Sequence, residues 1–341
     1  ESYVQGWLTS PETDLSSAIA AQSINNAEQA IKDGADINYY WLTPFLNEAV
    51  RKGYKPMVEL LLKNGAKVEA KTTALAWAPV HEAVEIGSLE ILEHLVSVGN
   101  ADLNSVNKDG YTALHIAATK DNALEIIRFI VGKKPNVDAQ TTPKTKSLTA
   151  LHMLAQRGKT EEGKLLIEGG ANLEMKSTEG KTALHYAAES APLEFVKTLV
   201  EKGSKLDVID SNGNTVLHHA ATRDTPEIFQ YLLRDDLQPN KKNNDGKTAT
   251  HVASEKNLTV LKAVVEAGGD INAIDNNQNT PLHLAVLSKN KAAVAYLISK
   301  GADINAQNNE GKSPAHMALD QDVLDLLKDL TEHNANLELK D

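Results

Sequence analysis

The amino-acid sequence predicts an all-α solenoid of stacked helix–turn–helix units that are joined by β-hairpin-like fingers. Three observations predict it: a short motif recurs at a nearly constant interval, residues that start and stop helices keep fixed places in each interval, and the apolar residues are mostly small and aliphatic. Hydrophobic residues make up 41% of the 341 residues, and aromatic residues only 4%. This composition suits thin helical layers that pack closely against their neighbours.

The recurring motif is centred on a histidine. Eight histidines follow one another at spacings of 34, 37, 33, 33, 33, 32 and 33 residues: His81, His115, His152, His185, His218, His251, His283 and His316. Six of them lie three residues after a threonine: Thr112, Thr149, Thr182, Thr215, Thr248 and Thr280. A threonine at a helix N-cap with a polar residue at the third helical position forms a capping box. We therefore interpret these threonines and histidines as structural.

One unit shows how each element follows from its residues. Thr280 is the expected N-cap, and Pro281 occupies the first helical position, where its missing N–H has no cost. A second helix is predicted over 292–299 from apolar residues at helical spacing. Gly301 then ends that helix in the left-handed conformation, and the chain turns into the next finger.

A period near 33 residues with a Thr-Pro-Leu-His-X-Ala motif is typical of ankyrin repeats, and the chain resembles the ankyrin-repeat family over nearly all its length. We expect residues 1–15 to form an N-terminal extension and residues 16–341 to form one domain of about ten repeats. The predicted repeats are 16–40, 41–73, 74–107, 108–141, 142–177, 178–210, 211–243, 244–275, 276–308 and 309–341.

The two ends depart from the pattern. The first unit lacks the motif, and the second has Asn47 in place of the histidine, as expected for terminal repeats that lose one apolar neighbour. Residues 334–341 are a finger that leads into a further unit, so we predict a fragment of a longer chain; the alternative is an array that ends in a finger. No apolar run is long enough to cross a bilayer, so membrane insertion is not expected.

Composition and motifs argue against catalysis. The chain has no cysteine, and its formal net charge is −11, which disfavours nucleic acid as a partner. Phosphate-binding, nucleophile-elbow and zinc-protease motifs are missing. Histidines on neighbouring stacked helices are too far apart to share one metal ion. We therefore expect no catalytic, cofactor-binding or metal-binding residue, and no enzyme activity.

The resemblance implies that a partner binds on the concave face, which is made of finger tips and inner helices. The residue that precedes the threonine is expected to be exposed there. Trp77, Tyr111 and Leu148 form an apolar run at this place, with Trp41 close by, and Trp and Tyr are enriched at interface hot spots. We hypothesise a partner site over repeats two to five. The alternative is that Trp41 and Trp77 fill gaps left by irregular motifs.

Further predicted contacts come from the ends of the inner helices: Arg51, Lys52, Ile86, Lys120 and Arg157. The cations among them suggest an acidic and apolar peptide as ligand. The finger over 141–147 is longer than the others, which indicates either a partner contact or a tolerated insertion. Residues 234–240 lack the terminating glycine, so a local irregularity is expected there.

The sequence thus predicts a monomeric, non-catalytic scaffold or adaptor that binds a protein or peptide. The alternative is the ankyrin segment of a larger microbial effector, toxin or channel whose activity lies elsewhere. The expected location is the cytoplasm, or a host cytoplasm if the protein is a secreted effector. The resemblance also implies possible hydroxylation of the finger residue Asn305, which follows Asp303 and Ile304; the alternative is that Asn305 only stabilises its turn.

Overall fold

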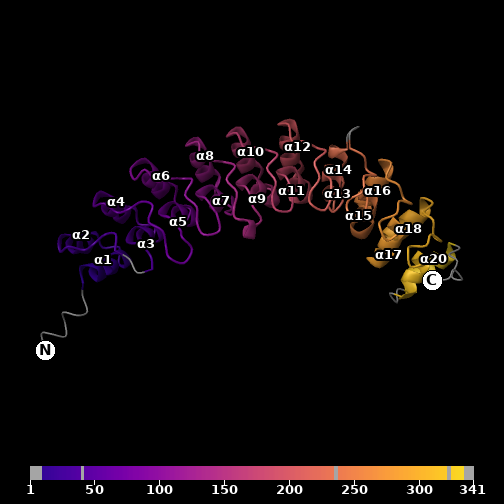
Figure 1. Ribbon diagram of the computed structural model, residues 1–341, viewed down its shortest axis with the longest axis horizontal. Helices are drawn as coiled ribbons and strands as arrows, with labels where there is room; N and C mark the ends of the chain where they lie inside the picture. Colours follow the sequence, from indigo (N-terminus) through magenta and orange to yellow (C-terminus); the bar gives the residue numbers. More distant parts are fainter. Residues whose placement is uncertain (1–9, 40–41, 234–236, 321–323, 334–341) are drawn as a thin grey trace, which may run out of the picture. The chain divides into compact units, whose positions relative to one another are not determined.

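The structure is a computed structural model that describes residues 10–39, 42–233, 237–320 and 324–333. These residues form a succession of antiparallel helix pairs, each made of an inner and an outer helix (Figure 1). The chain divides into two compact units: unit 1 comprises residues 1–154 and 161–172, and unit 2 comprises residues 155–160 and 173–341.

Unit 1 is built from α1 to α10. Its inner helices are α1 (Pro11–Ala20), α3 (Phe45–Arg51), α5 (Pro79–Glu85), α7 (Ala113–Ala118) and α9 (Ala150–Arg157), of which α9 also reaches into unit 2. Its outer helices are α2 (Ile24–Lys32), α4 (Lys55–Lys63), α6 (Leu89–Ser97), α8 (Leu124–Gly132) and α10 (Thr160–Glu168). Helix α1 begins at Pro11 and so includes residues 11–15 of the predicted N-terminal extension.

Unit 2 continues the same alternation from α11 to α20. Its inner helices are α11 (Ala183–Ser190), α13 (Val216–Ala220), α15 (Ala249–Lys256), α17 (Pro281–Leu287) and α19 (Pro314–Asp320). Its outer helices are α12 (Leu193–Glu201), α14 (Glu227–Leu232), α16 (Leu258–Glu266), α18 (Lys291–Ser299) and α20 (Leu324–Glu332). Of the irregularity predicted over 234–240, residues 234–236 lie outside the described ones, and the final finger over 334–341 lies outside them entirely.

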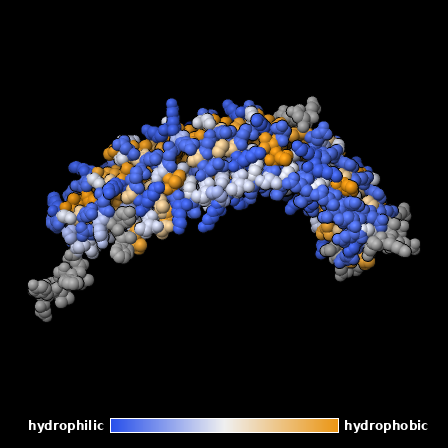
Figure 2. Space-filling view, viewed as in Figure 1, coloured by the Kyte–Doolittle hydropathy of each residue, from blue (hydrophilic) through white to orange (hydrophobic). Residues whose placement is uncertain are grey.

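The core of each unit consists of small residues that let helices approach closely. The alanine two positions after the recurring histidine is fully buried in most inner helices, as Ala117 and Ala253 illustrate. The outer helices contribute larger apolar side chains, such as Leu92 and Phe195. In the view of Figure 1, the apolar side chains that reach the surface are scattered among polar ones (Figure 2). No helix of the described residues combines the length and the apolar character needed to cross a membrane.

The threonine–histidine boxes begin the inner helices. In all six boxes the threonine N–H donates to Nδ1 of its histidine at 3.0–3.1 Å. Because Nδ1 accepts, Nε2 carries the proton. In four boxes Nε2 donates to the carbonyl that precedes the next repeat's threonine or serine: His115 to Leu148, His218 to Lys247, His251 to Asn279 and His283 to Lys312. One side chain thus caps its own helix and ties its repeat to the next.

Asn47 shows what that histidine position requires. Its side chain is fully buried in α3, and its Nδ2 donates to the carbonyl of Trp77 at 2.8 Å. The amide therefore makes the contact to the next repeat that a histidine makes elsewhere. It makes no capping bond to its own helix, because the N-cap of α3 is Pro44, which has no side-chain cap and no N–H.

The fingers are hairpin-like turns, and no β-strand is formed among the described residues. The N–H of Asp210, for example, donates to the carbonyl of Asn214 at 3.0 Å and closes one turn. Neighbouring fingers are joined by single backbone bonds, such as Ser211 N–H to Glu179 and Asn244 N–H to Asn212, each at 2.9 Å. Finger residues are thereby held in register along each unit.

Candidate partner-binding surface

Three positions in each repeat contribute to this surface, and we name them by their distance from the recurring histidine. We call the residue four before the recurring histidine the fingertip position, the residue six before it the pre-tip position, and the residue four after it the helix-end position. In unit 1 the fingertip residues of two successive repeats are Trp77 and Tyr111, with Leu75 and Asp109 at the pre-tip positions. Glu85 is the helix-end residue of α5.

These residues enclose a hollow of about 240 Å³ between two fingers and the inner helices α5 and α7. The rings of Trp77 and Tyr111 are half-buried, because each packs against the histidine of its own box, with ring centroids 6.1 Å and 5.7 Å apart respectively. Leu75 is 52% exposed at the rim. The hollow thus offers two anchored aromatic rings and an exposed aliphatic side chain to a ligand.

Leu148 does not extend this surface. The prediction that it is exposed is wrong, since its residue surface is only 8% exposed. The longer finger explains the difference: its inserted residues form a 3-10 turn, η2 (Pro143–Thr145), and Thr141 and Leu148 close the loop with a backbone bond of 2.9 Å. The insertion bends back onto the preceding finger, where Thr145 Oγ1 donates to the carbonyl of Asp109 and lines the hollow. Trp41 lies outside the described residues.

The predicted cations at the inner-helix ends are partly neutralised. Arg51 forms an ion pair with the buried Glu82 of the next repeat, and this hydrogen bond raises the pKa of Arg51. Lys120 Nζ lies 2.6 Å from Glu85 Oε1. The remaining predicted residues, Lys52, Arg157 and Ile86, are exposed.

A second hollow of about 830 Å³ lies at the other end of unit 1, between the fingers and helices α1 and α3. Tyr39 and Leu42 contribute exposed apolar surface to it. Its charged lining residues are Glu12, Asp36 and Glu48, all of them acidic. Sequence reasoning did not single out this hollow, because its acidic residues come from α1, the turn after α2 and α3, which lie together only in the folded chain.

In unit 2 the fingertip side chains are polar and pair with residues of the same unit, and a hollow of about 470 Å³ lies between the fingers that carry Asn279 and Lys312. Lysines occupy alternate fingertip positions and pair with the helix-end carboxylate of the same repeat: Lys181 with Glu189 at 3.0 Å, Lys247 with Glu255 at 3.2 Å and Lys312 with Asp320 at 2.8 Å. Asparagines occupy the positions between them and accept from the next finger, from Asn243 Nδ2 to Asn214 Oδ1 at 2.8 Å and from Asn308 Nδ2 to Asn279 Oδ1 at 3.0 Å.

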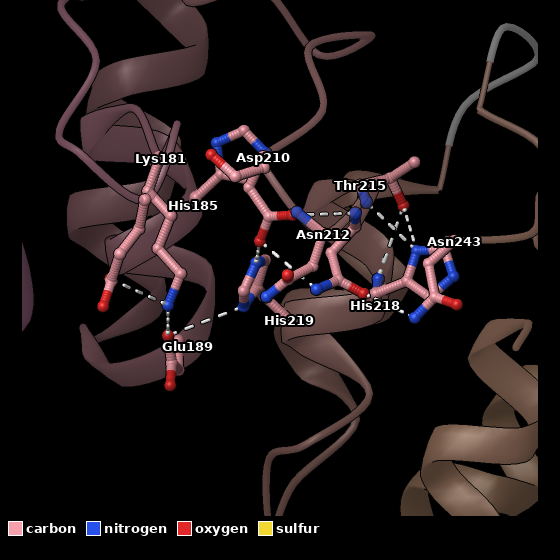
Figure 3. Close-up of polar contacts among 12 residues, drawn as sticks. Lys181, His185, Glu189, Asp210, Asn212, Thr215, His218, His219 and Asn243 are labelled. Carbon is pink, nitrogen blue, oxygen red and sulfur yellow. Dashed lines mark hydrogen bonds and ion pairs between the residues drawn. The ribbon is translucent and has the colours of Figure 1, made fainter. Parts of the chain in front are cut away.

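Beneath the fingers of unit 2, His219 joins two repeats through a polar cluster (Figure 3). Its Nε2 lies 2.8 Å from Asp210 Oδ2, and its Nδ1 lies 3.5 Å from Glu189 Oε2. Lys181 reaches the same carboxylate oxygen of Glu189 (Figure 3). Only the imidazolium form of His219 has an N–H to donate to both carboxylates.

The pKa values of the cluster follow from these contacts. Burial lowers the pKa of His219, but its hydrogen bonds to Asp210 and Glu189 outweigh burial and raise it above the ordinary value. The hydrogen bond from His219 lowers the pKa of Glu189 to about 2. Burial opposes ionisation of Asp210, yet hydrogen bonds from His219 and from Asn214 lower its pKa. By contrast, burial lowers the pKa of the box histidine His185 to about 4, so that ring is neutral.

Across the described part of the chain, no three His, Asp or Glu side chains are grouped so that they could hold a metal ion. The cluster around His219 also lacks a nucleophile next to a base. Asn305, the predicted hydroxylation site, is exposed in the turn after α18, and its N–H donates to Asp303 Oδ1 at 3.1 Å. Its hydroxylation stays a prediction.

Comparison with known families decides the assignment. The family model of ankyrin repeats (3 copies) matches residues 46–141, 122–210, 193–275 and 254–341. This chain belongs to the ankyrin-repeat family. Ankyrin repeats are a general protein–protein interaction module.

Among curated ankyrin proteins, the chain is 34% identical over 136 residues to human SH3 and multiple ankyrin repeat domains protein 2, which is 38% of this chain and 7% of that protein. It is 28% identical over 169 residues to ankyrin repeat and KH domain-containing protein mask-1 of Caenorhabditis elegans, 50% of this chain and 6% of that protein. It is 35% identical over 89 residues to the human Notch-regulated ankyrin repeat-containing protein, 25% of this chain and 76% of that protein. The chain thus spans less than a tenth of the first two relatives.

Within the ankyrin pattern, His219 departs from the regular motif because it follows the box residue His218 directly. That doubled histidine is the signal that could have led to the cluster. Its partners Glu189 and Asp210 come from the preceding repeat, so only stacking brings the three side chains together.

Proposed function

We propose that this ankyrin array is a non-catalytic scaffold or adaptor, and that a segment of a partner protein docks at the hollow around Trp77 and Tyr111. The observation that supports the proposal is the pairing of two anchored aromatic rings with the exposed Leu75 in one hollow of unit 1. Aromatic side chains that are held in place contribute large contact areas at little entropic cost.

The alternative role of Trp77 as a gap filler accounts for only part of its surroundings. The ring packs on His81, as a gap filler would, but it also lines a hollow of about 240 Å³ among the described residues of unit 1. The two roles differ in what removal of the ring would do. A docking residue is needed for the partner, whereas a packing residue is needed for stability.

The test compares Trp77→Ala and Tyr111→Ala with the wild-type chain in a pull-down whose bound proteins are identified by mass spectrometry. We expect each variant to keep its helical circular dichroism and to lose a wild-type partner by about 30-fold or more in affinity, as for a hot-spot residue. Tyr231→Ala, on outer helix α14, is the matched control and should bind as wild type. A large drop in melting temperature with unchanged binding would instead support the packing role.

A second proposal is that the array is one segment of a larger effector, toxin or channel. The observation that favours it is a match of 30% identity over 83 residues to alpha-latrotoxin-Lhe1a of Latrodectus hesperus, covering 21% of this chain and 6% of the toxin. Sequencing the complete reading frame tests it: a further domain with its own active site or membrane-spanning part is expected, and an array without any such domain would contradict it.

A further inference from the structure

The fingertip positions of unit 2 include lysines, whereas those of unit 1 do not. This difference bears on the chemistry of the partner segment that binds unit 1. The inference below rests on the proposed docking at Trp77 and Tyr111 and concerns the chemistry of the segment that docks.

Unit 2 shows what the fingertip environment holds when a cation is present. Lys181 Nζ lies 3.0 Å from Glu189 Oε2, 3.8 Å from Glu179 Oε2 and 5.2 Å from the centre of the Tyr186 ring. Its ammonium is thus bound by a helix-end carboxylate, a pre-tip carboxylate and an aromatic face. Each of these contacts is favourable for a cation.

A fingertip lysine paired with a helix-end carboxylate recurs at every second repeat along unit 2. Lys312 Nζ lies 2.8 Å from the helix-end residue Asp320 and 3.5 Å from the pre-tip residue Glu310. Lys247 pairs with the helix-end residue Glu255. Acidic residues at the pre-tip and helix-end positions are therefore a binding environment for a cation at the fingertip position.

Unit 1 keeps acidic residues at these positions but has no fingertip lysine. Glu85 is the helix-end residue of the repeat that carries Trp77, and Asp109 is the pre-tip residue of the next repeat, which carries Tyr111. The two carboxylates thus come from successive repeats, and both line the hollow between them. Lys120 of the next repeat reaches Glu85. The carboxylate of Asp109 forms no ion pair with any described residue, so the charge that Lys181 supplies in unit 2 is missing here.

The second hollow of unit 1 has the same character. Among the described residues that line it, the charged ones are Glu12, Asp36 and Glu48, and none is basic. The five charged residues that line the two hollows are therefore all carboxylates. Arg51, the cation expected to attract an acidic ligand, is instead bound to Glu82.

We infer that the segment docking on unit 1 is basic and apolar: a lysine or arginine of the partner takes the place of the missing fingertip lysine between Asp109, Glu85 and the aromatic rings, and a neighbouring apolar side chain covers Leu75. Arginine suits this place best, because its planar guanidinium stacks on an aromatic ring while it pairs with a carboxylate. This chemistry replaces the acidic peptide that the cations in the sequence suggested.

The experiment uses a phage-displayed library of random peptides of roughly twelve residues, selected on the whole chain and counter-selected on Trp77→Ala. Enriched peptides are synthesised, and their affinity is measured by fluorescence anisotropy at about 50 mM and about 500 mM NaCl. We expect peptides with net positive charge and apolar neighbours, whose affinity falls at the higher salt concentration.

Variants of the hollow sharpen the test. Asp109→Asn keeps the backbone carbonyl that holds the next finger and removes only the charge, so it should weaken binding about two- to fivefold. Tyr111→Lys installs a fingertip lysine as in unit 2 and should abolish binding of the same peptides. Asp245→Asn, at an exposed pre-tip position of unit 2, is the matched control and should leave the affinity unchanged.

The failures of the two proposals are distinguishable. Peptides that depend on Trp77 but are neutral or acidic, or that bind Asp109→Asn as tightly as the wild-type chain, would overturn the basic partner and leave the docking surface in place. A selection in which no peptide depends on Trp77 would overturn the docking surface, and the inference with it.

Discussion

The fingers of unit 1 and unit 2 are both hairpin-like turns, and they differ in the residues at the fingertip position. At the fingertip position, unit 1 has Trp77 and Tyr111, whereas unit 2 has Lys181, Lys247 and Lys312 with asparagines between them. The lysines are bound by carboxylates of their own repeats. The box histidine makes the same bond to the next finger in both units, as His115 and His251 show. The difference teaches that the box sets the fold of a repeat, while the fingertip residue decides whether the surface presents an aromatic ring or a lysine that is already paired with a carboxylate.

The fingers of the two units also differ in how far their charged side chains extend from the surface into the core. In unit 2 the polar contacts continue inward from Lys181 through Glu189 to His219 and to Asp210, whose side chain is 1% exposed. In unit 1 the hollow borders aromatic and aliphatic side chains, and its carboxylates, Glu85 and Asp109, lie at the surface or are half-buried. Changes in the fingers of unit 2 should therefore affect stability, and changes in the fingers of unit 1 should affect binding.

The largest stability effect is expected for His219→Ala. The substitution leaves the carboxylate of Asp210 buried without its cation, which typically costs about 3 kcal/mol or more. Chemical denaturation at about pH 6, followed by circular dichroism, measures the loss. His333→Ala, on an exposed histidine after α20, is the control and should change the free energy of unfolding little. Equal effects of the two substitutions would contradict the role of the cluster.

The wild-type chain and His219→Ala also test how the stabilising contribution of His219 depends on pH. The pKa of His219 is raised in the folded chain, so its stabilising contribution is fully present below the unfolded pKa of about 6.5 and is lost as the pH rises through the folded pKa. The stability gap between wild type and His219→Ala should shrink from about pH 6 to about pH 9. A gap that widens over this range would show that His219 is neutral in the folded chain.

A smaller effect is expected when a box histidine is replaced in unit 1. His115→Ala removes the acceptor for the Thr112 N–H and the donor to the Leu148 carbonyl, for a loss of about 2 kcal/mol. His115→Asn should cost less, because Asn47 reaches the carbonyl of the next repeat with its amide. The melting temperatures of His115→Ala and His115→Asn check this order of stability. An alanine variant more stable than the asparagine variant would refute the shared role of Asn47 and His115.

The smallest effect is expected for the exposed ion pairs of unit 2. Lys247→Met removes the partner of Glu255, and both side chains are more than a quarter exposed, so the loss should be below about 1 kcal/mol. Lys120→Met is the counterpart in unit 1 and should cost similarly little. Urea denaturation of both variants measures this. A loss above about 2 kcal/mol for Lys247→Met would show that the fingertip lysines support the fold of unit 2.

Local capping was the part most readily predicted from sequence. A threonine and a histidine three residues apart meet on the first turn of one helix whatever surrounds them, so the boxes at Thr112–His115 and Thr248–His251 could be identified without coordinates. Exposure was harder to predict. Leu148 holds the same register as Trp77, but the insertion before it closes as a separate turn and buries it. Register alone does not describe a loop whose length has changed.

The sequence by itself determined the all-α solenoid and its boxes, because both depend on residues that are near one another in the chain and on a constant period. Only the tertiary structure decided which charges are paired. Arg51 with Glu82, Lys120 with Glu85 and His219 with Asp210 each join residues of successive repeats. Such pairs form only after the helices stack, since stacking sets both the distance between two charges and their shielding from water.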